Sequence, residues 1–162
     1  MASDNFFRQA IEGSTFSFTA RPEPVAGDLR MSWGIGILLL SLFYAHGKKG
    51  SFQKLQFLAH AVRTPEGRGD VRDLMAGKLR VTEVSVRVEP WLNRAVSYAH
   101  GLGFVDVTKG KSVSLTEKGR RAAAALDADK TVFKEERAFV ADIAKNLTEA
   151  KLTRIWRMED LL

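Results

Sequence analysis

The 162-residue chain contains no cysteine and only three histidines. Without cysteine it has no disulfide, no thiolate zinc site and no cysteine nucleophile, a composition that suits a reducing compartment. His46, His60 and His100 are scattered, with no second histidine or acidic residue at metal-ligand spacing. We therefore expect neither a metal site nor any other cofactor.

A long apolar run is also missing. The most apolar stretch, residues 31–45, is fifteen residues long and includes two glycines and two serines. A membrane-spanning helix needs about 20 apolar residues, so this stretch predicts a buried core helix and no membrane partner. Residues 1–5 have no basic cluster that leads into an apolar stretch, which predicts no secretory signal and a cytoplasmic protein.

Motifs that carry catalysis are lacking as well. Residues 47–51 read Gly-Lys-Lys-Gly-Ser, but they lack the spacing of a phosphate-binding loop and follow a predicted helix instead of a strand. Glu135 and Glu136 are adjacent on a predicted helix and so point to different sides, which indicates solvated charge and not an acid–base pair. No serine stands in a nucleophile-elbow context. The sequence predicts a protein that is not an enzyme and has no catalytic residues.

Positive charge is plentiful, and it is concentrated in the middle of the chain. The net charge is +6, and residues 63–121 alone contribute 12 Lys and Arg against 7 Asp and Glu. A basic patch is typical of nucleic-acid binders. A solvated basic face without a ligand would give the same count, so charge alone leaves both interpretations open.

Hydrophobic periodicity predicts a mainly α protein with a small β-hairpin (α+β). Two short alternating runs around a Gly-containing turn, residues 104–107 and 112–115, predict the hairpin. Residues 81–89 alternate and predict a further strand, whereas residues 64–69 predict a loop. The predicted helices cover residues 32–46, 51–62, 70–79, 90–103, a segment that Thr116 caps, 133–147 and 152–156. We divide the chain into an N-terminal arm (1–30), a main domain (31–126) and a C-terminal helical extension (127–162).

Two strings flank the predicted hairpin. Residues 103–105 read Gly-Phe-Val, and residues 115–120 read Leu-Thr-Glu-Lys-Gly-Arg. Together with the order of the elements, residues 90–121 resemble the winged helix-turn-helix domains of MarR-like and PadR-like regulators. There a helix runs into Gly-hydrophobic-hydrophobic, the hairpin (the wing) follows, and a similar Leu-Thr-Glu-Lys-Gly string opens the next helix. The resemblance implies a winged helix-turn-helix domain.

The helix predicted from Pro90 offers a surface for double-stranded DNA. We expect its apolar side to face inward, through Leu92, Ala95, Val96, Ala99 and Leu102. The outward side chains then suit a major groove, where Asn and Arg read base edges. Lysines at the wing tip and basic residues of the next helix suit phosphates. The predicted DNA-binding residues are Asn93, Arg94, Ser97, His100, Lys109, Lys111, Lys118, Arg120 and Arg121. The alternative is that the winged helix only docks protein.

A second resemblance covers nearly the whole chain. It depends on four strings: residues 21–26 (RPEPVA), 49–58 (KGSFQKLQFL), 86–95 (VRVEPWLNRA) and the LTEKG string. Together they look like the small middle components of three-component ABC-ATPase systems, the Lamassu-like bacterial antiphage modules. This resemblance implies a non-enzymatic adaptor that links an SMC- or RecN-like ABC ATPase to an effector protein such as a nuclease.

Protein contacts are expected at the two ends of the chain, at Arg21, Pro22, Trp156 and Arg157. The alternative to the adaptor is a homodimeric winged-helix transcriptional regulator. An adaptor should be a monomer alone and bind DNA without sequence preference. A regulator should be a homodimer that prefers its own site over random duplex by about 10³-fold or more.

Overall fold

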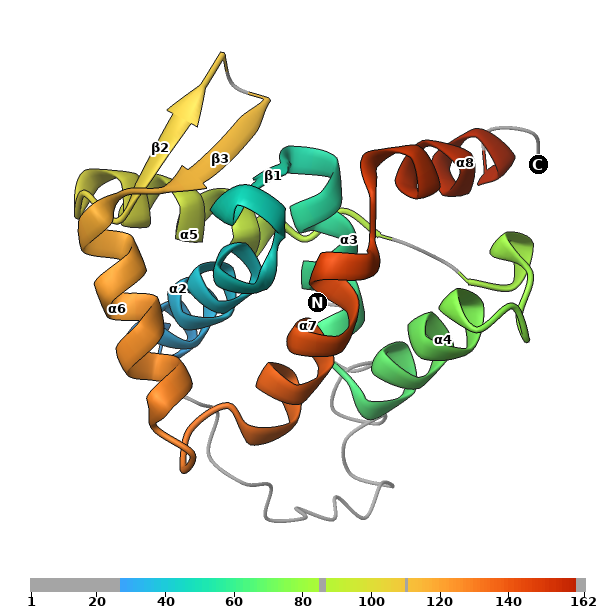
Figure 1. Cartoon of the computed structure of the whole chain (residues 1–162), viewed down its shortest axis with the longest axis horizontal. Helices are drawn as coiled ribbons and strands as arrows, with labels where there is room; N and C mark the ends of the chain where they lie inside the picture. Colours follow the sequence, from blue (N-terminus) through green and yellow to red (C-terminus); the bar gives the residue numbers. More distant parts are fainter. Residues whose placement is uncertain (1–26, 85–86, 110, 160–162) are drawn as a thin grey trace, which may run out of the picture.

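The computed structural model describes residues 27–84, 87–109 and 111–159 (Figure 1). Within them the chain forms seven α-helices and one small antiparallel sheet, which confirms a mainly α protein with a small β component. The helices are α2 (Gly27–Tyr44), α3 (Phe52–Val62), α4 (Pro65–Met75), α5 (Pro90–Gly101), α6 (Glu117–Ala128), α7 (Lys134–Asn146) and α8 (Glu149–Glu159). The strands are β1 (Lys49–Ser51), β2 (Val105–Thr108) and β3 (Ser112–Leu115), and the 3₁₀ turns are η1 (His46–Lys48) and η2 (Val81–Glu83).

Helix α2 is the central element, as the apolar run predicts. The helix packs against α5, α6 and α7. Five of its apolar residues are 2% exposed or less: Ile37, Leu38, Leu39, Leu40 and Leu42. The expected start at Ser32 is wrong, because α2 begins at Gly27 and Ser32 lies inside it. No proline follows residue 24 before the apolar run, and extending a nucleated helix costs little. The helix therefore crosses the boundary drawn at residue 30.

The sheet has the strand order β1–β3–β2, and its β2–β3 hairpin is the predicted one. The strand expected over residues 81–89 is wrong for the described residues: η2 occupies its start, where the Glu83 side chain accepts the Arg80 N–H at 2.7 Å. The third strand is instead β1, which pairs Gly50 with Val113. A strand of three residues is too short to show an alternating pattern, so local sequence does not predict it.

Helix α4 replaces the loop that we expect over residues 64–69. Thr64 caps it by accepting the Gly67 N–H at 3.0 Å, and Pro65 takes the first helical position. The buried Arg68 then donates to the Val62 carbonyl at 2.8 Å and to Glu135 at 2.6 Å. Threonine followed by proline is a helix-start signal that the glycines at positions 67 and 69 obscured.

The last two helices share the core of the main domain. The amphipathic helix predicted over residues 133–147 is confirmed as α7, which buries Phe139, Val140 and Ile143. Helix α8 adds Leu152 and Ile155 to the same cluster, which also holds side chains of α2, α3 and α4. A second cluster joins the other side of α2 to α5, α6 and the sheet. Helices α7 and α8 thus share a core with α2, α3 and α4 (Figure 1).

Candidate nucleic-acid interface

A buried polar network fixes the start of α5. Glu89, whose side chain is 4% exposed, precedes Pro90 and donates its backbone N–H to the Gln56 side chain at 2.8 Å. Arg63 Nη1 donates to both Glu89 carboxylate oxygens, at 3.1 and 2.9 Å. His60 Nδ1 lies 3.1 Å from the same carboxylate, so the expectation that this histidine has no acidic neighbour is wrong. The network links the start of α5 to the α3 region through residues that are distant in the sequence. Local sequence patterns therefore do not predict it.

This network gives a first prediction. Glu89→Gln keeps the size of the side chain but removes the charge that Arg63 pairs with, so we expect a loss of about 1–2 kcal/mol in the free energy of unfolding. Urea denaturation measures it. Glu66→Gln, on an exposed part of α4, is the matched control and should change stability little. Equal effects of the two substitutions would show that the Glu89 charge does not hold α5.

The outward face of α5 is the one that periodicity predicts. Asn93, Arg94, Ser97 and His100 are all exposed, and the residues expected to face inward are buried except one. That exception is Leu102, which is 48% exposed. It is the C-cap residue of α5 and lines the apolar groove described below. Edge-to-face packing of Trp33 on Trp91, with ring centroids 5.1 Å apart, ties α5 to α2.

Two of these four polar side chains already have partners within the protein. The Asn93 side-chain oxygen accepts from Gln56 Nε2 at 3.4 Å. His100 Nδ1 lies 2.9 Å from the Val105 carbonyl, an acceptor, so this nitrogen carries the proton. The side chains of Arg94 and Ser97 form no hydrogen bond or ion pair with the described residues. They are therefore the members of this face most available to a ligand.

Tyr98 is a further member of this face that sequence reasoning missed. It is 58% exposed and stands one helical turn after Arg94. An exposed aromatic ring next to an arginine suits stacking on a nucleic-acid sugar or base, or packing on a partner. Its spacing from Arg94 is visible in the sequence, but the helical periodicity assigned Tyr98 to neither the apolar nor the polar face of the helix.

The hairpin tip carries its two lysines on the surface. Lys109 and Lys111 are both exposed, and Lys109 adopts a left-handed backbone conformation with φ 52°. The Lys111 carbonyl accepts the Phe52 N–H at 2.9 Å, which ties the tip to the first residue of α3. This hydrogen bond holds the tip of the hairpin, and with it the two lysines, beside the start of α3.

The basic residues predicted on α6 have different surroundings. Lys118 Nζ donates to the Leu102 carbonyl at 2.8 Å and lies 5.0 Å from the Phe104 ring centroid, so this charge caps the end of α5. Arg121 lies 3.9 Å from Glu117 on its own helix. Arg120 and Arg121 are exposed, and neither forms a hydrogen bond or ion pair with a described residue of α5 or the hairpin. The structure thus brings Lys118 to α5 but leaves Arg120 and Arg121 on α6.

The segment from Leu115 to Gly119 connects the hairpin to α6 in a fixed geometry. The Thr116 side chain accepts the Gly119 N–H at 3.0 Å and donates to the Gly103 carbonyl at 2.7 Å. The Thr116 N–H donates to the Phe104 carbonyl at 3.0 Å. A Cβ on Gly119 would lie 1.9 Å from that carbonyl oxygen, so only glycine fits. The motif therefore specifies local geometry and not a ligand.

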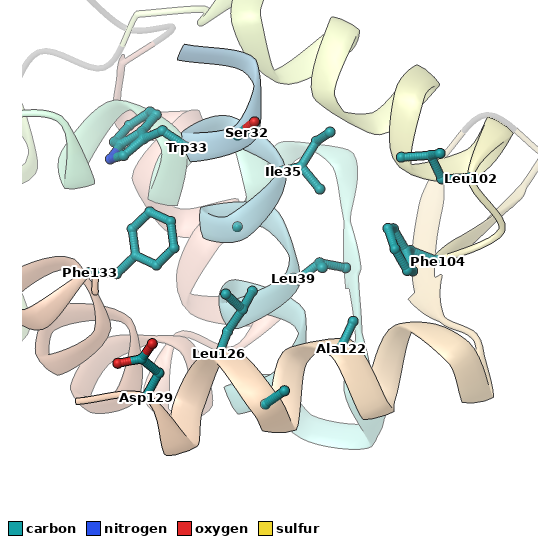
Figure 2. Close-up of a pocket in the computed structure, with 12 residues that line it drawn as sticks. Ser32, Trp33, Ile35, Leu39, Leu102, Phe104, Ala122, Leu126, Asp129 and Phe133 are labelled. Atoms are coloured by element: carbon teal, nitrogen blue, oxygen red, sulfur yellow. The ribbon is translucent and has the colours of Figure 1, made fainter. Parts of the chain in front are cut away.

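An apolar groove of about 780 Å³ lies between α2, α6 and the turn after α5 (Figure 2). Leu39, Leu102, Phe104 and Leu126 line it, and Phe133 closes one end. The Phe133 ring packs so tightly on α2 that a Cβ on Gly36 would lie 2.6 Å from its Cζ atom. Arg137 holds this corner by donating to the Asp129 and Val132 carbonyls at 2.5 and 3.1 Å.

The side chains of the four predicted partner residues all lie outside the described part of the structure. Arg21 and Pro22 lie outside the described residues, and Trp156 and Arg157 belong to α8 with side chains outside the described part. Among the described residues, no three His, Cys, Asp or Glu side chains are grouped to hold a metal ion. Of the helices that the structure describes, none is long and apolar enough to cross a membrane.

Comparison with known proteins adds no information on function. No family model, no curated protein and no solved structure matches the chain. What the described residues define is a mainly helical protein with a three-stranded antiparallel sheet and a basic hairpin beside an exposed polar helix face.

Proposed function

We propose that the chain is a winged-helix protein whose α5 and β2–β3 hairpin contact double-stranded DNA. The observation that carries the proposal is the joint exposure of Arg94 and Ser97 on α5 and of Lys109 and Lys111 on a hairpin fixed to α3. An exposed helix with arginine fits the major groove, while lysines that protrude from a hairpin fit the phosphates beside it. The interval 87–121 supports this with seven Lys and Arg against three Asp and Glu, of which Glu89 is buried.

The winged-helix part of the proposal is supported by the order of the elements. Helix α5 runs directly into the turn at Gly103, the hairpin follows, and Thr116 opens α6. The additional pairing of β1 with β3 ties the hairpin to the residues that precede α3. One departure from a helix-turn-helix is clear: α4 and η2 lie between α3 and α5, where a turn of three or four residues is typical. The DNA contact proposed here therefore depends on α5 and the hairpin and not on a standard two-helix unit.

We further propose that this domain serves as a non-enzymatic adaptor in a bacterial antiphage complex, between an SMC- or RecN-like ABC ATPase and an effector. The resemblance of four strings to the middle components of such systems supports it. So does the presence of two surfaces that share no residue, since the polar face of α5 suits DNA and the apolar groove suits a protein.

An affinity pull-down of the tagged full-length protein from its native host, with and without nuclease, tests the adaptor. We expect an SMC-like ATPase and a second protein to be recovered in both samples, identified by mass spectrometry. Recovery of the protein alone, with a defined DNA fragment that nuclease removes, would contradict the adaptor and support a regulator.

A homodimeric transcriptional regulator is the second candidate, and the apolar groove is the observation that favours it. Homodimer interfaces are more apolar than other protein surfaces, and Leu102 leaves nearly half of its surface exposed beside this groove. Light scattering after size exclusion separates the two candidates. An adaptor should be a monomer at micromolar concentration, whereas a regulator should be a dimer that Leu102→Glu dissociates.

A further inference from the structure

A second large cavity, of about 750 Å³, is lined by residues of β1, the start of α3 and the junction of α7 and α8. Most of the residues that line it are polar or charged, unlike those of the apolar groove. Three lysines contribute to it, Lys49 from β1, Lys54 from α3 and Lys145 from α7, together with His46. Glu149 is the one acidic residue of the lining. The cavity therefore carries net positive charge. Its lysines and its carboxylate come from four elements, β1, α3, α7 and α8.

Lys54 is the unusual member of this set. The residue is only 5% exposed, yet its ammonium group forms no hydrogen bond or ion pair with the described residues. Burial lowers its pKa below the usual range for lysine, and the charge of Glu149 acts in the opposite direction. The burial falls mainly on the alkyl part of this side chain, because Trp91 Nε1 is the one buried side-chain polar atom without a partner among the described residues. The ammonium group is therefore open to the cavity, where a ligand with negative charge would pair with it.

Glu149 indicates which ligand chemistry fits. Its carboxylate accepts the Ser51 N–H at 3.3 Å and the Ser51 hydroxyl at 2.8 Å, at the first turn of α3. An anion at a helix N-terminus is favoured by the free N–H groups and by the helix dipole. The protein thus already places one carboxylate near Lys54, on an exposed side chain that Ser51 holds by two hydrogen bonds.

We propose that this cavity binds a phosphate group between Lys54, Lys49 and Lys145, with Glu149 as the internal competitor for the site. A volume of about 750 Å³ lies within the range of small-molecule sites and exceeds the need of a lone phosphate. The phosphate has two plausible sources, a free nucleotide or the backbone of a duplex. The proposal does not depend on α5 or the hairpin tip, so it stands or falls separately from the proposed DNA contact.

Two substitutions with opposite expected effects test it on the full-length protein. Lys54→Met keeps the length of the buried side chain and removes its charge, so phosphate binding should weaken at least tenfold. Glu149→Gln removes the competing charge and should tighten binding several-fold. Lys130→Met, on the exposed segment between α6 and α7, is the matched control and should have no effect.

The probes are inorganic phosphate, ATP and a 20-base-pair duplex, each titrated by calorimetry at 50 mM salt. If phosphate and ATP follow the expected order of the variants, the ligand is a free phosphate compound. If only the duplex follows it, the phosphate belongs to the DNA backbone. If Lys54→Met and Glu149→Gln both match the control for all three probes, or if Lys54→Met binds more tightly, the proposal is overturned.

Discussion

Replacement of Gly119 with alanine is expected to destabilise the protein by about 3 kcal/mol or more. The new Cβ would lie 1.9 Å from the Phe104 carbonyl oxygen and 2.9 Å from its carbon, and a backbone group cannot move away as a flexible side chain can. Relief of the clash would separate α6 from the hairpin and break the hydrogen bond from the Thr116 N–H to Phe104. Chemical denaturation followed by circular dichroism measures the loss.

Gly69→Ala is the control for this substitution. Gly69 is also a helical glycine, in α4, but in the described part of the chain no atom lies within 4 Å of its Cβ position. Alanine should therefore stabilise the protein there, by about 0.5–1 kcal/mol, because it lowers the entropy that the chain loses on folding. If both substitutions stabilise the protein, the close contact between Gly119 and Phe104 does not exist in solution.

Reversal of both wing-tip charges, Lys109→Glu with Lys111→Glu, is expected to weaken binding to a random duplex by roughly 60-fold at 0.1 M salt. Each phosphate contact that is lost removes about 0.9 from the slope of log K against log salt, so the slope should fall by about 2. Both side chains are exposed, and the tip is held by the Lys111 carbonyl and not by a lysine side chain, so the fold should tolerate the change. Fluorescence anisotropy at several salt concentrations measures both quantities.

Lys78→Glu with Lys130→Glu changes the net charge by the same amount on residues remote from the hairpin. Lys78 follows α4, and Lys130 lies between α6 and α7. This control should lower the affinity only slightly, since the charges are distant from the proposed contact and salt screens them. Equal losses in the two double variants would mean that net charge attracts DNA and that the wing tip makes no specific contact.

The parts of the fold that sequence reasoning predicted depend on signals between neighbouring residues. Ser51 and Thr116 cap their helices by accepting the N–H three residues later, and Pro90 occupies a first helical position. The hairpin around residue 110 and the outward face of α5 also follow from short-range alternation and helical period. Each of these features is encoded within a few residues, so one sequence is enough to predict it.

The parts that were missed depend on contacts between residues distant in sequence. Strand β1 exists because Gly50 pairs with Val113. Glu89 has its role because Gln56, His60 and Arg63 of the α3 region reach it. Neither pairing leaves a local pattern, and the cavity around Lys54 combines residues of six elements in the same way. In contrast, the start of α4 was a local signal that was read wrongly.

A titration of the ¹⁵N-labelled full-length protein with a random 20-base-pair duplex, followed by amide chemical shifts, would locate the DNA contact. We expect shifts that grow with added duplex and cluster on the outward face of α5, around Arg94 to Tyr98, and at Lys109 and Lys111, with the exposed side of α4 unchanged. Shifts spread evenly over the molecule, or none at 50 mM salt, would contradict the proposed DNA contact through α5 and the hairpin.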